Sequence, residues 1–233
     1  TIKGIFMASS EGFSHSPEIV EHINTSNRQI KTKIPVPESI PILKKMYSLE
    51  SRSMHGQLPL IWDQAKNHNV YDRWGNKWID FTSTIFVANA GHGNKHITNT
   101  LKKLLSKPLF HTYNYANEYR IKYLEYLIKH TPINFEKAYL ISAGTESTEA
   151  VMKFMRLNGI QKNKGLGIIT LSGSYHGRTL GAEMAGGDKV YDAWVSANDS
   201  DLYKIDYPDP SLVNEKNGYQ HFYVQINQLE KQN

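Results

Sequence analysis

The segment between residues 138 and 171 places the strongest constraint on the fold of this chain. Ala138–Ser142 is a short apolar run that favours a β-strand, and a second such run follows at Ile168–Leu171. Residues 146–158 between them have helical periodicity, with an expected apolar side formed by Ala150, Val151, Phe154 and Met155. A strand, a helix and a strand within about 35 residues predict a parallel, right-handed βαβ unit. The chain is therefore expected to be an α/β protein with a parallel-rich sheet.

A β-hairpin is predicted upstream of this unit. Two β-rich runs, Val70–Asp72 and Lys77–Phe81, flank a Gly-Asn pair at residues 75–76 that favours a tight turn. Residues 1–60 have weaker periodicity and several prolines, with one short helical stretch near Leu43–Ser48. They are interpreted as an arm, and a poorly ordered leader is the alternative.

Two helices are predicted between the hairpin and the βαβ unit. Residues 96–107 have the apolar spacing of a half-buried helix, carried by Ile97, Leu101, Leu104 and Leu105. A second helix is expected over residues 117–130, where the side chain of Asn117 can accept hydrogen bonds from the first free N–H groups.

Composition and charge exclude several classes of protein. The 233 residues include no Cys, which excludes disulfide scaffolds, thiolate metal sites and cysteine catalysis. No apolar run approaches the ~18 residues that a membrane helix requires. The net charge of +5 is spread along the chain, whereas a nucleic-acid-binding protein more often concentrates it in a stripe. We therefore expect a cytoplasmic globular protein with neither a nucleic-acid nor a membrane partner.

The turn at Ser142–Glu146 is the first candidate site. The first N–H groups of the helix that follows have no partner within the helix, and with the helix dipole they form an anion site. Gly144 allows a ligand to approach the backbone, and Thr145 adds a hydroxyl group. An ordinary helix start is the alternative, because Glu146 and Glu149 suit the dipole and offset part of its attraction for an anion.

A second candidate site, Ser172–Thr179, follows the next predicted strand. It offers the aromatic ring of Tyr175, the imidazole of His176 and the guanidinium of Arg178. Neighbouring parallel strands end at one edge of a sheet, so the two sites could lie side by side. A ligand ring could then stack on Tyr175 while the phosphate group of the same ligand binds at the Gly144-Thr145 turn. Alternatively, Tyr175 and His176 lie at the edge of the core and Arg178 is a solvated charge.

His92 stands between Gly91 and Gly93, so the backbone bends around it. Histidine titrates near neutral pH, but a lone histidine between glycines is more often structural than catalytic. The sequence has no nucleophile elbow, no Walker A loop and no zinc-helix motif, and we expect no metal site.

Together these residues resemble the class III aminotransferases of fold type I, which depend on pyridoxal 5'-phosphate (PLP). Four segments match in order: Val70–Phe81, Ala88–His92, Ser142–Glu146 and Tyr175–Ala182. Leu109–Tyr113 is also similar, and the match runs from about residue 56 to residue 187. The fourth segment looks most like the acetylornithine, ornithine and 4-aminobutyrate branch.

The resemblance implies a role for each candidate residue. The backbone N–H groups of Gly144 and Thr145 would hold the cofactor phosphate, and Tyr175 would stack on the pyridine ring. His176 would lie close behind that ring. Arg178 stands where this branch holds a substrate carboxylate, a task that suits its planar guanidinium. The Schiff-base lysine is expected beyond Asn233, so no residue of this chain is assigned as catalytic.

The resemblance also implies an organisation and an activity. Residues 1–60 would form an N-terminal arm and small-domain segment, and residues 61–233 an incomplete PLP-binding large domain that includes the hairpin. The Ser83–Asn89 and His111–Tyr113 stretches would help to line the substrate entrance, and the full-length protein would be a homodimer. The implied reaction moves an amino group from an amino acid, with ω-amino acids among the candidates, to a 2-oxo acid.

Two alternatives to this activity stay open at the level of sequence. One is an inactive, truncated protein that keeps cofactor binding or an interaction surface. The other is a related PLP-dependent decarboxylase or aminomutase.

Overall fold

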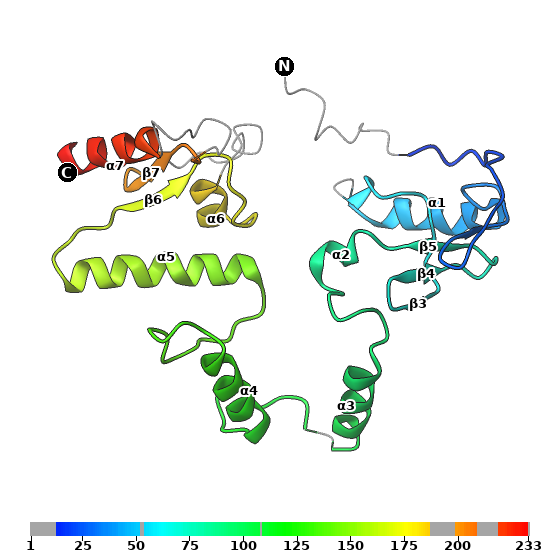
Figure 1. Ribbon diagram of the computed structural model, residues 1–233, viewed down its shortest axis with the longest axis horizontal. Coiled ribbons are helices and arrows are strands. Elements are labelled where there is room, and N and C mark those ends of the chain that lie inside the picture. Colours follow the sequence, from blue (N-terminus) through cyan, green and yellow to red (C-terminus); the bar gives the residue numbers. More distant parts are fainter. Residues whose placement is uncertain (1–12, 52–53, 108, 187–198, 209–218, 233) are drawn as a thin grey trace. The chain divides into compact units, whose positions relative to one another are not determined.

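The computed structural model describes residues 13–51, 54–107, 109–186, 199–208 and 219–232 (Figure 1). The chain forms two compact units, Thr1–Asn114 and Tyr115–Asn233. The division predicted near residue 60 refers to the domains of a whole enzyme, and it stays a prediction.

The first unit is built on an antiparallel sheet with the strand order β1-β2-β5-β4-β3. Its strands are β1 (Ile23–Asn24), β2 (Gln29–Ile30), β3 (Gln64–Lys66), β4 (Asn69–Tyr71) and β5 (Lys77–Ile79). Val70 faces Trp78 across the central pair, and Gly75 in the intervening turn has a φ of +89°. The predicted hairpin is therefore confirmed.

Buried polar contacts fix the turn of this hairpin to the preceding segment of the chain. The Asp72 carboxylate accepts hydrogen bonds from the backbone N–H groups of Trp74 and Asn76, at 2.9 and 2.8 Å. The Asn76 amide donates to Asp72 Oδ2 at 2.7 Å and to Thr32 Oγ1 at 2.8 Å, while its oxygen accepts from the Lys31 N–H at 2.8 Å. Only 1% of Asn76 is exposed, so the turn is stabilised from within.

Helices accompany this sheet. The 3-10 helix η1 (Pro37–Ser39) leads into α1 (Ile40–Leu49), which contains the predicted Leu43–Ser48 stretch and buries Leu43. The turn α2 (Ser83–Phe86) and the helix α3 (Lys95–Leu105) follow the sheet in sequence.

The position of α3 is as predicted, but most of its apolar side is exposed, and only Leu104 of the four expected residues is half-buried. Ile97, Leu101 and Leu105 are 46%, 53% and 62% exposed, although their spacing predicted a half-buried face. Helical spacing identifies the side of a helix that could be buried and carries no information about the partner that would bury it.

The second unit contains four helices among its described residues, and a parallel pair of strands. Its helices are α4 (Glu118–Lys129), α5 (Gly144–Gln161), α6 (Leu180–Ala185) and α7 (Gln220–Gln232). The strands β6 (Ile168–Leu171) and β7 (Leu202–Ile205) pair in parallel, from Ile168 opposite Leu202 to Leu171 opposite Ile205. The helix predicted over residues 117–130 and the strand predicted at 168–171 are confirmed.

The strand predicted at Ala138–Ser142 was wrong. These residues have no regular secondary structure, and Tyr139 and Leu140 are 68% and 41% exposed. A strand is stable only when its N–H and C=O groups pair with a neighbour, and β6 takes β7 as its described partner. The parallel pair of this unit therefore lies one element later in the chain, with α6 between its strands.

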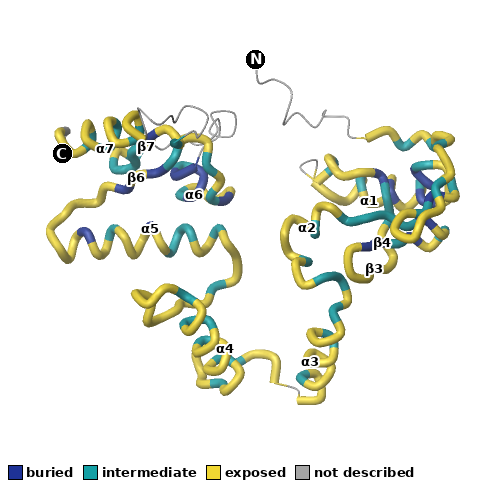
Figure 2. Tube along the Cα trace, viewed as in Figure 1, coloured by how far each residue is buried: buried dark blue, intermediate teal, exposed yellow. Residues whose placement is uncertain are grey.

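The helix predicted over residues 146–158 is confirmed and is longer, but its buried side was predicted wrongly. Met152 packs with Ile168 and Ala185 in the small core of this unit, and Leu202 lies against them. The expected apolar side is largely exposed, as Figure 2 shows along α5, with Val151 at 53%, Phe154 at 51% and Met155 at 46%. Because α5 is apolar on more than one side, its periodicity did not identify the side that packs.

Candidate functional site

The N-terminus of α5 is left without a side-chain cap. The helix starts at Gly144 after an extended Ala143, with φ −149° and ψ 161°, and Ala143 has no side chain that could accept a hydrogen bond. The side chains of Asn94 and Asn117 do accept such bonds at the starts of α3 and α4. The first turn of α5 is thus the one of these three whose N–H groups are not offered a side-chain acceptor by the residue before the helix.

The loop that carries the second candidate site lies directly against this turn. A Cβ atom placed on Gly177 would be 2.4 Å from Thr145 Oγ1 and 2.7 Å from Thr145 Cβ. Gly177 is buried and has a φ of +132°, a conformation that glycine adopts without strain. Glycine at this position therefore allows residues 175–178 to approach the start of α5.

A carboxylate of α5 holds the far end of the same loop. Glu149 accepts hydrogen bonds from the hydroxyl of Thr179 and, at 3.0 Å, from the N–H of Ala182 in the first turn of α6. Glu146 accepts one from the N–H of Ser142 at 3.0 Å. Both acids predicted to offset the helix dipole thus have backbone donors of their own.

The side chains of the loop differ in their surroundings. Ser174 Oγ donates to the carbonyl of Leu171 at 2.7 Å and lies 3.0 Å from His176 Nε2. A hydroxyl has one proton, so His176 Nε2 donates to Ser174, and in the neutral ring Nδ1 is then the acceptor nitrogen. The ring of Tyr175 is 76% exposed, and Arg178 is also exposed.

All five candidate residues belong to the second unit, and the structure brings the two predicted segments together. Gly144 and Thr145 form the start of α5, and the loop of Tyr175, His176 and Arg178 passes beside it because of Gly177. Their approach was predicted from neighbouring strand ends, whereas the observed contact is made between a helix start and a loop.

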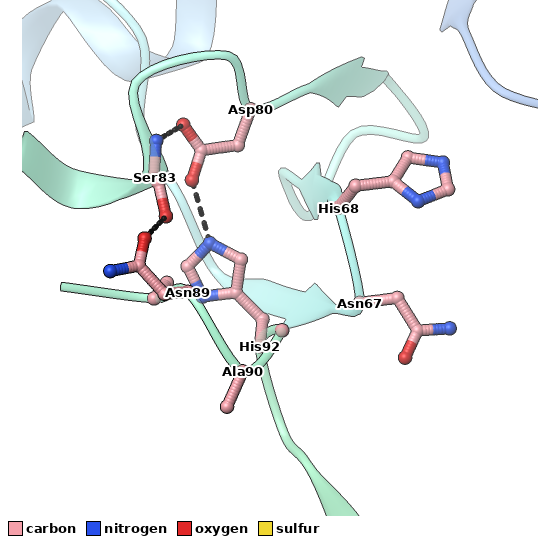
Figure 3. A pocket seen from close by; sticks show the side chains of 9 residues that line it. Asn67, His68, Asp80, Ser83, Asn89, Ala90 and His92 are labelled. Carbon is pink, nitrogen blue, oxygen red and sulfur yellow. Dashed lines mark hydrogen bonds and ion pairs between the residues drawn. The ribbon is translucent and has the colours of Figure 1, made fainter. Parts of the chain in front are cut away.

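A polar pocket of the first unit forms a separate candidate site (Figure 3). It has a volume of about 430 Å³, and its lining includes His68, Asp80, Ser83, Asn89 and His92. Asp80 Oδ2 lies 2.7 Å from His92 Nε2, and the Asp80 side chain is 1% exposed. His92 is therefore held by a buried carboxylate, in keeping with the structural interpretation of this residue.

Asp80 is the residue that sequence reasoning missed. Burial alone would raise the pKa of Asp80, but hydrogen bonds from His92, from Thr82 and from the Ser83 N–H outweigh it and hold that pKa below its ordinary value. The available signal was its place directly after a β-strand and shortly before a glycine-flanked histidine.

The backbone that follows Asp80 is unusual. Ser83, Thr84, Ile85 and Phe86 have φ values of 48°, 51°, 57° and 66°. Left-handed helical conformation costs about 1–2 kcal/mol per residue for side chains other than glycine, and more for β-branched ones such as Thr84 and Ile85. The α2 turn is therefore a strained segment that its surroundings must hold.

Neither a membrane-spanning helix nor a metal site is found among the residues that the structure describes. No helix there has both the length and the apolar content needed to cross a membrane. Nor do the described residues gather three or more His, Asp or Glu side chains as a metal site.

The chain spans about a third of the length of the curated relatives that it matches. The acetylornithine aminotransferase of Clostridium acetobutylicum is 34% identical over 142 residues, covering 59% of this chain and 35% of that protein. The adenosylmethionine-8-amino-7-oxononanoate aminotransferase of Staphylococcus aureus is 33% identical over 141 residues, covering 57% of this chain and 30% of that protein.

Solved structures agree on the fold. The taurine:2-oxoglutarate aminotransferase from Bifidobacterium kashiwanohense, in complex with PLP and glutamate, superposes with a TM-score of 0.68 at 20% identity, covering 84% of this chain and 44% of that chain. The ornithine aminotransferase from Toxoplasma gondii superposes with a TM-score of 0.63 at 16% identity, covering 72% and 40%.

The family assignment rests on most of the chain. Residues 51–233 match the family Aminotransferase class-III, so the resemblance predicted from four motifs is confirmed. The chain therefore belongs to the class III aminotransferases, within the PLP-dependent transferases of fold type I.

Proposed function

We propose that this chain is the N-terminal part of a PLP-dependent aminotransferase and that it holds the phosphate and ring of the cofactor. The reaction is the transfer of an amino group from an amino acid, with ω-amino acids among the candidate donors, to a 2-oxo acid. The observation that carries the proposal is the contact of Gly177 with Thr145, which joins a phosphate-binding turn to an aromatic loop.

The residues at the start of α5 fit a phosphate group. A Cβ placed on Gly144 would meet nothing within 4 Å, so the space beside this turn is open to a ligand. The first N–H groups and the dipole of α5 attract an anion, and Thr145 contributes a hydroxyl. The carboxylates of Glu146 and Glu149 do not compete with a phosphate for these donors, because they accept hydrogen bonds elsewhere.

The loop residues fit the remainder of the cofactor and the substrate. The exposed ring of Tyr175 offers an aromatic face to a pyridine ring, and the bond to Ser174 fixes the orientation of His176 beside it. Arg178 would bind a substrate carboxylate through two parallel hydrogen bonds. Bound PLP supplies an electron sink for the carbon that loses its proton, and these residues would orient the ring and the substrate for that step.

Binding of the phosphate can be tested on this chain alone. Pyridoxine 5'-phosphate is the suitable probe, because it has no aldehyde and cannot react with surface lysines. In calorimetric titration it should bind at least about tenfold more tightly than pyridoxine, a difference of ~1.4 kcal/mol. Equal binding of the two compounds would show that α5 does not hold a phosphate.

The activity requires the complete coding sequence. The expressed enzyme should transfer an amino group between an amino acid and 2-oxoglutarate, and an Arg178→Lys variant should raise the KM for the amino donor. Release of CO₂ would instead identify a decarboxylase, and tight phosphate binding without any turnover would identify an inactive binding protein.

Assembly and location are part of the same proposal. We expect a homodimer for the complete enzyme, which sedimentation can measure. A cytoplasmic location is also expected, although two matched acetylornithine aminotransferases, from Candida glabrata and Saccharomyces cerevisiae, are named as mitochondrial. Fluorescent tagging of the complete protein distinguishes the two compartments.

A further inference from the structure

The strained α2 turn is held at its base by one carboxylate. Asp80 Oδ1 accepts hydrogen bonds from the N–H of Thr82 at 3.0 Å, from its hydroxyl at 2.7 Å and from the N–H of Ser83 at 3.0 Å. These three donors precede or begin the run of residues with positive φ. A single ionised group thus fixes the direction in which the chain enters the left-handed turn.

The other oxygen of this carboxylate is held by His92, and His92 is held by the sheet. Its backbone N–H and C=O exchange hydrogen bonds of 2.8 Å with Asn67, in the turn between β3 and β4. The indole of Trp62 lies edge-on to the imidazole at 6.2 Å between ring centres. The imidazole that contacts Asp80 is therefore fixed to the antiparallel sheet and not to the turn that Asp80 holds.

The turn in its observed conformation places polar side chains at the pocket. Ser83 Oγ lies 3.4 Å from Asn89 Oδ1, and Asn89 Nδ2 donates to the carbonyl of Phe86 at 2.7 Å. Figure 3 shows Ser83 and Asn89 beside the Asp80–His92 pair, with His68 pointing away from Asp80. Rotation of the turn out of its left-handed conformation would carry Ser83 away from this position.

We propose that Asp80 and His92 are positioning residues that hold the left-handed Ser83–Phe86 turn and thereby fix Ser83 and Asn89 at the pocket wall. That this wall belongs to the substrate entrance rests on the proposed function and on the expectation that Ser83–Asn89 lines that entrance, whereas the holding of the turn does not. His92 acts through Asp80 and makes no contact with substrate in this role.

Amide hydrogen exchange of the 233-residue chain, without cofactor or substrate, tests the holding role. In a His92→Leu variant the Thr82–Ala88 amides should exchange at least about tenfold faster, because Asp80 loses the donor that orients it. The amides of Val70 and Trp78 in the hairpin should change less than about twofold. His92→Gln, whose amide can still donate to Asp80, should restore most of the protection.

A control and a second variant separate positioning from folding. His68→Leu changes the same pocket and should leave exchange of the turn unaltered. If His92→Leu does not fold, His92→Asn replaces it, because that amide is too short to reach Asp80. Unchanged exchange in the turn, or equal acceleration in turn and hairpin, would overturn the positioning role.

The complete enzyme tests the link to the substrate entrance. His92→Leu should raise the KM for the amino donor severalfold, while kcat changes less than about twofold. A loosened turn with an unaltered KM would overturn the link to the entrance and leave the phosphate site of α5 untouched, because the pyridoxine 5'-phosphate titration measures that site separately.

Discussion

The turn between β4 and β5 and the turn that begins α5 treat their backbone N–H groups in opposite ways. In the first, the Asp72 and Asn76 side chains satisfy the turn and tie it to Thr32. In the second, Ala143 offers no side-chain acceptor to the first N–H groups of the helix that follows. Polar groups that a segment satisfies internally stabilise its fold, whereas groups that it leaves open are available to a ligand.

We call the turn between β4 and β5 the closed turn, because its own side chains pair its N–H groups, and the start of α5 the open turn. The largest effect is expected from a substitution that breaks the closed turn. Asn76→Ala removes the acceptor of Lys31 and the donor to Asp72 and leaves buried polar groups unpaired. The free energy of unfolding of the first unit should fall by about 3 kcal/mol. Denaturation followed by tryptophan fluorescence measures it, because Trp74 and Trp78 flank this turn, and a Trp194→Phe background removes the signal of residue 194.

Asn99 offers a matched control for this loss. It is exposed on α3, so Asn99→Ala should change stability by less than about 0.5 kcal/mol. Equal losses in the free energy of unfolding for the two variants would mean that the buried hydrogen bonds of Asn76 do not stabilise the turn.

The closed turn is also the part of the fold that sequence predicted best. Two short runs and a Gly-Asn pair suffice to predict a hairpin, because the two strands that pair, β4 and β5, are neighbours in the sequence. The helix cap of Asn117 and the helical stretch near Leu43–Ser48, which lies inside α1, are local in the same sense, and they were predicted for that reason.

Non-local features of the second unit were predicted less well. The 138–142 run has the composition of a strand, but a strand also requires a partner, and β6 pairs with β7 instead. The buried side of α5 depends on Met152 meeting Ile168 and Ala185, which its periodicity alone does not identify. In the first unit, Asp80 was missed because its importance comes from His92, twelve residues away along the chain.

The next largest effect is expected where the open turn meets its loop. Gly177→Ala places a methyl group against Thr145 and should weaken pyridoxine 5'-phosphate binding by more than about tenfold, which is ~1.4 kcal/mol. Gly173→Ala is the matched control, because its φ is also positive, at +72°, but its Cβ would meet nothing within 4 Å. If both variants lose affinity equally, backbone conformation matters at Gly177 and close approach to Thr145 does not; if neither loses affinity, the contact with Thr145 has no role in binding.

A smaller effect is expected from protonation of Asp80. The folded state lowers the pKa of this carboxyl, so its contribution to stability is present at neutral pH and is lost as the pH falls through that lowered value. Amide exchange of the α2 turn, corrected for the intrinsic rate, should therefore accelerate only below about pH 4.

The titratable side chains that line this pocket allow the acceleration of exchange at acidic pH, here called the acidic transition, to be assigned to one group. The titratable groups among its described lining residues are His68, Asp80 and His92. An Asp80→Asn variant should lose the acidic transition, while His68→Leu should keep it. Persistence of the transition in Asp80→Asn would assign it to another group.

The smallest effect is expected from changes in helix capping. These changes also compare satisfied and open N–H groups most directly, because a side-chain cap can be added to α5 and removed from α4. Ala143 and Asn117 have similar extended backbones, with φ −149° and −144°. Ala143→Asn should therefore cap α5 without moving the backbone and stabilise its first turn by about 1 kcal/mol, while Asn117→Ala should destabilise α4 by a similar amount.

The same two variants should differ in phosphate binding. An amide oxygen at residue 143 competes with a phosphate for the same N–H groups, so pyridoxine 5'-phosphate should bind the Ala143→Asn variant severalfold more weakly. It should bind the Asn117→Ala variant with unchanged affinity. Amide exchange of residues 144–148 measures the gain in stability, and calorimetry measures the loss of affinity. A variant that is more stable and binds the phosphate as well as before would show that the open N–H groups of α5 are not those that the ligand uses.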